Sequence, residues 1–145
     1  MARGAPDVGG IAMTMPALNT FLVEDSPVIR ENLIATLQEL TPVRVVGEAE
    51  DEAGARLWLG TEGHDCDLVI VDIFLRRGSG LGVLQAMFNG PRRCPRVVLT
   101  NFATNDVRRR CLELGADAVF DKSNQIDALI DYCRALGERQ ADDAR

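Results

Sequence analysis

The feature that most constrains this fold is an alternation of short apolar runs with longer segments of helical spacing. Five runs have the length of a strand and are rich in Val, Ile, Leu or Phe: "LNTFLV", "VRVVGEA", "DLVIVDIF", "RVVLTN" and "DAVFDK". Strands that alternate with helices predict a parallel sheet covered on both faces. The runs lack clean polar alternation, as expected of strands buried on two sides. We therefore expect an α/β fold, a doubly wound five-stranded parallel sheet with five helices in three layers.

The segments between these runs carry helix signals. Apolar residues at helical spacing predict a helix from Pro27 that Thr41-Pro42 ends, and Gly80-Leu81-Gly82 opens another helix that ends near Asn89. Gly115 stands where a helix C-cap is expected. The chain is long enough for one domain with a real core. We expect a flexible, Gly-, Ala- and Pro-rich tail at 1–16, a folded domain at 17–137, and a fraying polar tail at 138–145.

Charge and hydropathy exclude several classes of function. The net charge of -6 argues against direct nucleic-acid binding. The run Arg108-Arg109-Arg110 is a local exception, either the solvated face of a helix or a docking patch for an acidic protein. No segment approaches the roughly 18 consecutive apolar residues of a membrane span, and the N-terminus lacks the apolar region of a signal peptide. We expect a cytoplasmic chain with no membrane contact.

The cysteines do not predict a zinc site. Cys66, Cys94, Cys111 and Cys133 form no CxxC pair, and the single histidine, His64, has no histidine partner at ligand spacing. Cys111 and Cys133 fall on apolar helical stripes, so we expect both to fill the core. In a cytoplasmic chain the thiols are expected to be reduced.

Polar side chains follow four of the five predicted strands. Glu24 and Asp25 come after the first strand, Asp72 after the third, Thr100 after the fourth and Lys122 after the fifth. In open α/β sheets, ligands bind outside the carboxyl ends of the strands. Each residue alone is weak evidence, because polar residues at strand ends are common. Their joint placement predicts a site with three acids, a hydroxyl and a lysine.

These residue types suit one kind of chemistry. Three carboxylates favour a hard divalent cation such as Mg²⁺. Asp72 is then an anionic nucleophile for phosphorus, and Lys122 offsets charge on the phosphoryl oxygens. An ordinary reading is open for the first pair, because Asp25 or Ser26 is a suitable N-cap for a helix that starts at Pro27. Capping and metal binding are compatible with each other.

Taken together, these segments resemble the receiver domain of two-component response regulators, from about Leu18 to Leu136. The resemblance rests on "FLVEDSPVIRENL", "VVGEAED", "DLVIVDIFLRRGSGLGVL", "RVVLTN" and "GADAVFDKS". It implies a flavodoxin-like (CheY-like) fold and phosphorylation on Asp72. It also implies that Glu24, Asp25, Asp72 and the backbone carbonyl of Phe74 bind Mg²⁺, while Thr100 and Lys122 contact the phosphoryl group.

The chain departs from the family pattern at a few positions. Ser123 follows the lysine where proline is usual, so the Lys122–Ser123 bond is either a strained cis bond or rearranged to trans. Asn101 replaces a small residue, and Val119 stands where many members carry a mobile Tyr or Phe. Alternation along the strand points the neighbouring Phe120 to the opposite face. Arg76 replaces a common proline. No chemical group of the site is lost.

The resemblance implies partners as well. A histidine kinase or a histidine phosphotransfer protein supplies the phosphoryl group, a downstream protein reads it, and a phosphorylation-linked homodimer is compatible with this scheme. The chain itself acts as an enzyme only in its own phosphorylation and dephosphorylation. It leaves no room for an output domain, so we expect either a stand-alone regulator or a fragment.

Other readings remain open at this stage. The strand-end acids could be mere caps and solvated loop residues. A receiver-like interaction module that is rarely phosphorylated is a second reading, favoured by Asn101, Val119 and Ser123. An aspartyl phosphatase or phosphotransferase of another α/β class commonly needs a second acid two residues after the nucleophile, where this chain has Phe74.

Overall fold

Five parallel strands form one sheet in the order β2-β1-β3-β4-β5 in the computed structural model, which describes residues 16–143. The strands are β1 (Leu18–Val23), β2 (Val43–Ala49), β3 (Leu68–Val71), β4 (Arg96–Thr100) and β5 (Ala118–Asp121). The helices are α2 (Pro27–Leu40), α3 (Glu52–Gly60), α4 (Gly80–Asn89), α5 (Asn105–Glu113) and α6 (Ile126–Asp143). Over this range the predicted doubly wound fold, with five strands and five helices, is confirmed.

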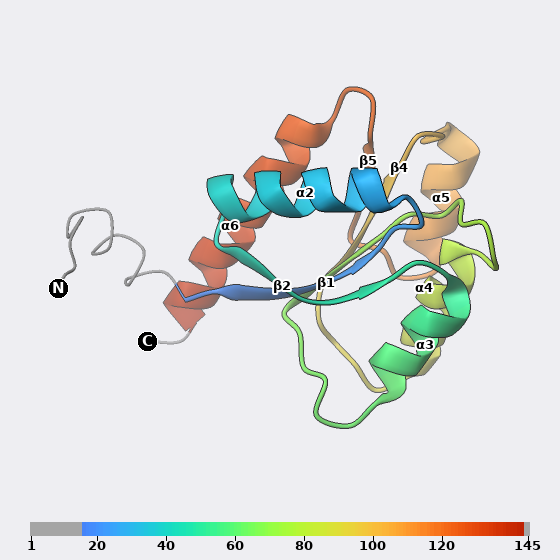
Figure 1. Ribbon diagram of the computed structural model, residues 1–145, viewed down its shortest axis with the longest axis horizontal. Coiled ribbons are helices and arrows are strands. Elements are labelled where there is room, and N and C mark those ends of the chain that lie inside the picture. The colour runs from blue at the N-terminus through green and yellow to red at the C-terminus, as the bar shows by residue number, and fades with distance from the viewer. Residues whose placement is uncertain (1–15, 144–145) are drawn as a thin grey trace, which may run out of the picture.

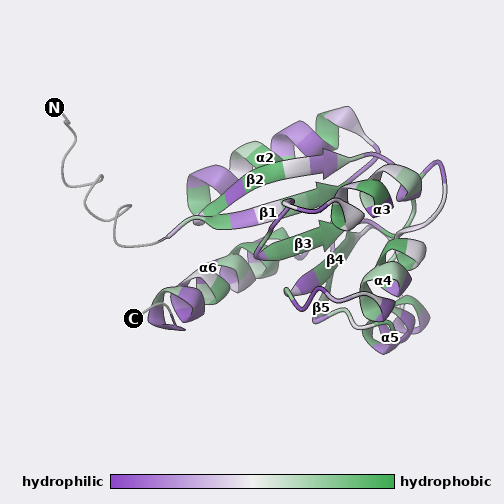
Figure 2. Ribbon diagram, turned by 90° about the horizontal axis from the view of Figure 1, so that it is seen from below, coloured by the Kyte–Doolittle hydropathy of each residue, from purple (hydrophilic) through white to green (hydrophobic). Residues whose placement is uncertain are grey.

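Two hydrophobic cores lie on the two faces of the sheet. Helices α2 and α6 cover one face, and α3, α4 and α5 cover the other (Figure 1). Side chains alternate along β1, so Phe21 packs into the core under α3, α4 and α5, and Leu22 packs into the core under α2 and α6. Hydrophobic residues run along β1 and β3 in Figure 2. Cys111 and Cys133 are fully buried, one in each core, which confirms their predicted role.

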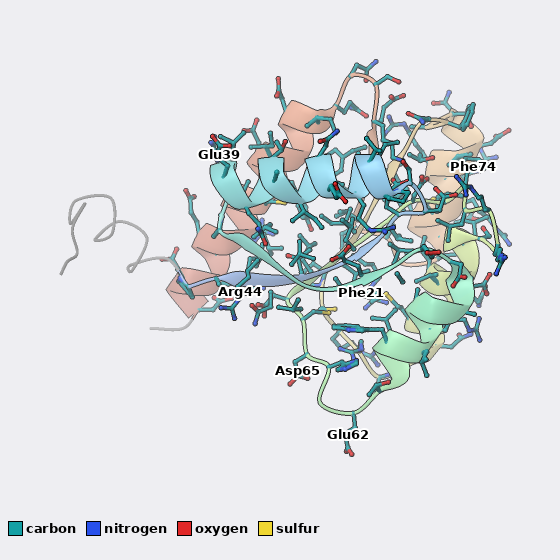
Figure 3. All side chains as sticks on the ribbon, viewed as in Figure 1. Phe21, Glu39, Arg44, Glu62, Asp65 and Phe74 are labelled. Atoms are coloured by element: carbon teal, nitrogen blue, oxygen red, sulfur yellow. The ribbon has the colours of Figure 1, made fainter. Side chains whose placement is uncertain are left out.

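The expectation of strands buried on two sides holds in the centre of the sheet and is wrong for the two edge strands, because β2 alternates and only Val119 of β5 is buried. All residues of β3 and β4 are buried. Strand β2 is an edge strand with an alternating pattern, in which Arg44, Val46 and Glu48 are exposed. Figure 3 shows Arg44 on this strand. Strand β2 lies at the edge of the sheet, where the helices cover the two faces less completely, so these side chains remain in water.

The helix ends follow the predicted caps. Ser26 caps α2, because its Oγ accepts a hydrogen bond from the backbone N–H of Ile29 at 3.3 Å. Asp25 is therefore not needed as the cap and is free for another role. Gly115 follows α5 with φ of 95°, a left-handed conformation that favours glycine, as its predicted C-cap position requires.

Only the C-terminal one of the two predicted tails lies mostly within the described residues. Of the predicted tail at 1–16, residues 1–15 lie outside the described residues. At the other end α6 continues to Asp143, so the polar segment from Glu138 is helical rather than frayed up to that residue. Figure 2 shows this last part of α6 as mostly hydrophilic. Among residues 16–143, no helix combines the length and apolar character needed to cross a membrane.

Candidate functional site

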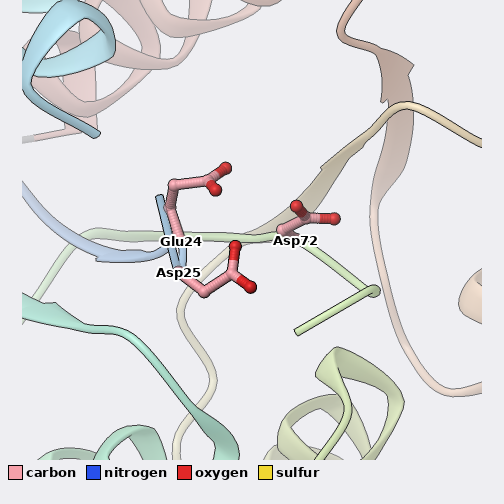
Figure 4. Close-up of side chains that lie close together, drawn as sticks. All are labelled: Glu24, Asp25 and Asp72. Carbon is pink, nitrogen blue, oxygen red and sulfur yellow. The ribbon is translucent and has the colours of Figure 1, made fainter. Parts of the chain in front are cut away.

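Three carboxylates meet at the carboxyl edge of the sheet. Glu24 and Asp25 follow β1, and Asp72 follows β3; one carboxylate oxygen from each lies within 4.8 Å of the others (Figure 4). The parallel pairing of Val23 with Val71 sets this geometry, since it brings the next residues of both strands together. The Asp72 N–H also donates to the carbonyl of Val23 at 3.0 Å.

Lys122 neutralises part of this acidic cluster. It is the only lysine in the sequence, and its Nζ lies 2.5 Å from Glu24 Oε1 and 2.7 Å from Asp72 Oδ2. The side chains of Lys122 and Glu24 are only 9% and 2% exposed. Burial alone lowers the pKa of Lys122, but the hydrogen bonds and charges of Asp72 and Glu24 outweigh it and raise the pKa above its ordinary value. The lysine is therefore held as a cation.

Each carboxylate of the cluster also accepts a backbone hydrogen bond. Ser26 N–H donates to Glu24 Oε2 at 3.1 Å and Phe74 N–H donates to Asp72 Oδ1 at 3.2 Å. The third acid, Asp25, accepts from the Arg76 N–H at 3.0 Å. These bonds hold the acids in fixed orientations, although like charges at this spacing repel.

The turn into α4 comes very close to Asp72. The Gly80 N–H donates to the carbonyl of Ile73 at 2.9 Å, and a Cβ on Gly80 would lie 2.1 Å from the carbonyl oxygen of Asp72. Only glycine fits this approach. Ser79 caps the helix through the N–H of Leu81. The sequence around Gly80 thus fixes the backbone on which Asp72 stands.

A small cavity of about 150 Å³ lies over the carboxylates. Thr100, Asn101 and Lys122 line it together with the acids. Thr100 is fully buried, and its Oγ1 accepts a long hydrogen bond of 3.4 Å from the Phe102 N–H. Phe74 and Phe102 also line the cavity, and they pack edge to face with ring centroids 5.1 Å apart. All six predicted site residues therefore border one pocket.

The positions that depart from the family pattern have clear structural outcomes. The part of the chain described contains no cis peptide bond, so the Lys122–Ser123 bond is trans, and the Ser123 N–H donates to Asp121 Oδ1 at 2.7 Å. Val119 is buried in the core under α3, α4 and α5. Phe120 points to the opposite face, as predicted, where it packs against Tyr132 with centroids 5.9 Å apart.

Sequence reasoning missed the contacts of two arginines, Arg30 beside the site and Arg108 on α5. Arg30 donates to the carbonyl of Glu24 at 2.6 Å, and its Nε lies 2.9 Å from Glu48. Arg30 stands in the first turns of α2, directly after the short loop that carries Glu24, and this position is the signal that could have predicted the contact. The predicted solvated face is wrong for Arg108, which is half-buried and donates to the carbonyl of Val119 at 2.8 Å.

Comparison with known proteins agrees with this arrangement. Residues 20–134 match the model of the response regulator receiver domain. The transcriptional regulatory protein PdtaR of Mycobacterium tuberculosis is 35% identical over 109 residues, which cover 75% of this chain and 51% of that protein. The chain spans between 13% and 58% of the length of the curated relatives that it matches.

Solved structures show the same fold. The receiver domain of the Francisella response regulator 1452 has a TM-score of 0.74 at 19% identity, covering 85% of this chain and 98% of that one. A response regulator from Burkholderia pseudomallei, solved with a phosphorylated aspartic acid, a calcium ion and citrate, has a TM-score of 0.70 at 22% identity and covers 88% and 73% of the two chains. At these identities the likeness concerns the fold.

The chain belongs to the response regulator receiver domain family of two-component signalling. Receiver domains are generally non-enzymatic signalling modules that interact with histidine kinases and downstream targets. They bind Mg²⁺ at an acidic pocket, and the cluster of Glu24, Asp25 and Asp72 has the oxygen donors and the excess negative charge that such an ion requires.

Proposed function

We propose that this chain is a phosphoacceptor that is phosphorylated on Asp72 by a histidine kinase or a histidine phosphotransfer protein. The single observation that carries the proposal is the joint contact of Lys122 Nζ with Glu24 and Asp72 inside the acidic pocket. A lysine held between a metal-binding acid and the nucleophile is the arrangement needed to receive a phosphoryl group. The partner class follows from the family.

The fit to Mg²⁺ rests on the donor set. Glu24, Asp25 and Asp72 bring three carboxylates within 4.8 Å, against one lysine, so the pocket keeps a net negative charge. In the proposal these acids and the backbone carbonyl of Phe74 hold the ion. Bound there, Mg²⁺ would offset charge on the phosphoryl oxygens.

The chain's own residues carry the transfer. A carboxylate oxygen of Asp72 forms the new bond to phosphorus, while the bond from phosphorus to the donor nitrogen or oxygen breaks and the donor leaves with its electron pair. Lys122 stabilises the negative oxygens because it remains protonated. The Thr100 hydroxyl donates a hydrogen bond to the product. The chain catalyses only these steps on itself.

Phosphorylation then alters contacts with a downstream protein or with a second copy of the chain. We place the protein in the cytoplasm, where kinases, small acyl phosphates and Mg²⁺ are available together. Direct binding of nucleic acid is not part of the proposal, because the net charge is -6.

The test is intact mass after incubation with Mg²⁺ and acetyl phosphate. We expect one added phosphoryl group of about 80 Da in the wild type, and none in Asp72→Asn or without Mg²⁺. Asp65→Asn, in the exposed loop before β3 (Figure 3), is the matched control and should label normally. Labelling that persists in Asp72→Asn would reject the assignment. A wild type that takes no phosphoryl group from any donor would favour the interaction module instead.

A further inference from the structure

At the edge of the sheet opposite the acidic pocket, two cysteines from separate segments meet. Cys66 precedes β3 and Cys94 precedes β4, 28 positions apart, and their Sγ atoms lie 3.9 Å from each other. The neighbouring strands are held together here, because the Val69 N–H donates to the carbonyl of Pro95 at 3.0 Å. Figure 3 shows Asp65, next to Cys66, far from the segment of Phe74.

This pair is accessible and has a cationic neighbourhood. Both cysteines are half-buried, in contrast with Cys111 and Cys133 in the cores. Cys94 lines a surface cavity of about 280 Å³ that is also lined by one acid, Asp117, and by three arginines, namely Arg92, Arg93 and Arg96. A small uncharged or anionic molecule can therefore reach Cys94 without unfolding of the chain.

The contact polarises the two thiols in opposite directions. The hydrogen bond from Cys66 lowers the pKa of Cys94 to about 7, against the effect of burial and with help from Arg96 and Arg92. The same hydrogen bond, together with burial, raises the pKa of Cys66. The contact therefore favours the thiolate on Cys94 over the thiolate on Cys66, with the thiol of Cys66 beside it. The nucleophilic form of a cysteine is the thiolate.

We propose that Cys66 and Cys94 form a redox site of the chain, which closes to a reversible disulfide when it meets a peroxide. In the first step the Cys94 sulfur attacks one oxygen of the peroxide, the O–O bond breaks, and Cys94 becomes a sulfenic acid. In the second step the Cys66 sulfur attacks Cys94 Sγ, loses its proton, and displaces the hydroxyl as water. The hydroxide released in the first step takes up a proton, so one hydrogen peroxide gives two waters while the dithiol loses two electrons and two protons.

The geometry permits this closure with small movements. A disulfide has an S–S length of about 2.05 Å, so the two sulfurs must approach by roughly 1.9 Å, which side-chain rotation at loop positions supplies. The bond would close a loop that contains β3 and α4. It would constrain the unfolded chain, so the oxidised protein should melt at a higher temperature than the reduced one.

The test uses the purified full chain, first reduced and then treated with one to a few equivalents of hydrogen peroxide. After alkylation of the remaining thiols and digestion with trypsin under non-reducing conditions, we expect peptide 57–76 joined to peptide 94–96. The intact mass should fall by about 2 Da. Dithiothreitol should reverse both changes. Bonds to Cys111 or Cys133, bonds between chains, or four remaining thiols would each overturn the proposal.

Variants separate the two roles. In Cys66→Ser, oxidation by hydrogen peroxide should stop at the sulfenic acid of Cys94, which dimedone traps. Cys94→Ser should lose the fast reaction with hydrogen peroxide. Cys111→Ala is the matched control and should keep it, since burial raises the pKa of that thiol to about 11. In the wild type at pH 7, Cys94 should be alkylated about tenfold faster than Cys111. Equal alkylation rates of Cys94 and Cys111 in the wild type would contradict the assignment, and this test needs no variant that folds. Dimedone found on Cys66 in Cys94→Ser would also contradict it.

Discussion

The two halves of the acidic pocket are held in very different ways. On the side of β1 and β3, each of the three carboxylates accepts a backbone N–H, and two also contact Lys122. On the side of β4, Thr100 Oγ1 makes one hydrogen bond within residues 16–143, a 3.4 Å bond that it accepts from the Phe102 N–H, and Asn101 and Phe102 are exposed. The acid half is thus fixed in advance for chemistry, whereas the half around Thr100 is free to respond to it.

The largest effect after loss of Asp72 is expected from Lys122→Met. Removing the cation leaves Glu24 and Asp72 buried without their counter-ion, so unfolding free energy should fall by about 3 kcal/mol. Denaturant titration measures this, and added Mg²⁺ should recover part of the loss. Arg109→Met, which breaks an exposed ion pair with Asp106, is the control and should change stability little. Equal effects of the two substitutions would contradict a fixed acid half.

The pH dependence of this contribution has a definite sign. Because the folded pKa of Lys122 lies above 10.5, its stabilisation is complete below pH 10.5 and is lost as the pH rises through the folded value. On the alkaline side, the difference in unfolding free energy between wild type and Lys122→Met should therefore shrink only above that pH. As the sole lysine, Lys122 gives a single ¹³Cε signal in lysine-labelled protein, and its titration midpoint should exceed 10.5.

The second effect sharpens the role of Asp25. Ser26 is the cap of α2, so Asp25→Ala should leave the helix intact and weaken Mg²⁺ binding by on the order of tenfold or more. Calorimetric titration measures the affinity, with Asp65→Asn as the control. An unchanged affinity would remove Asp25 from the metal site and leave it as a partner of the Arg76 backbone and side chain.

The sequence predicted the sheet, its helices and the meeting of Glu24, Asp25, Asp72, Thr100 and Lys122. These follow from strand-end positions, because parallel strands present their carboxyl ends at one edge. Contacts between separate loops could not be predicted from the sequence, and the contact of Cys66 with Cys94 is an example. Their approach depends on the register of β3 with β4, which no local pattern encodes.

The orientation of the Arg108 side chain also could not be predicted from the sequence. Its run of three arginines is typical of a solvated helix face, and Arg109 and Arg110 are indeed exposed. Arg108 instead reaches Gln125 Oε1 at 2.8 Å as well as Val119, because long side chains can bury their stems and still satisfy the head. Which of three equal residues turns inward depends on tertiary packing.

A smaller effect, on the rates of phosphorylation and hydrolysis, is expected in the half of the pocket around Thr100. Asn101 lines the pocket, and the rings of Phe74 and Phe102, 49% and 59% exposed, stand beside it. We expect Asn101 to hinder the approach of donors and of water. Asn101→Ala should accelerate phosphorylation by acetyl phosphate and hydrolysis of the product by a factor of about 3 to 10. Decay of labelled protein measures this. Slower hydrolysis in the variant would mean that the amide orients the water.

The smallest expected change is in backbone protection. Val119 is buried and carries no ring, so phosphorylation should be read through the region from Thr100 to Leu114, which contains α5. Amide exchange with and without beryllofluoride, which stands in for the phosphoryl group, measures this. Protection changes confined to α3 and α4 would contradict a conformational change in the region from Thr100 to Leu114.

The central claim is that Asp72 carries the phosphoryl group. Reduction of the phosphorylated protein with sodium borohydride converts an aspartyl phosphate to homoserine, and peptide sequencing by mass spectrometry locates it. If Asp72 is the phosphoacceptor, homoserine should be found at position 72 alone, in protein incubated with donor and Mg²⁺ and not in protein incubated with EDTA. Homoserine at position 25, or a phosphoryl group that survives reduction unchanged, would contradict it.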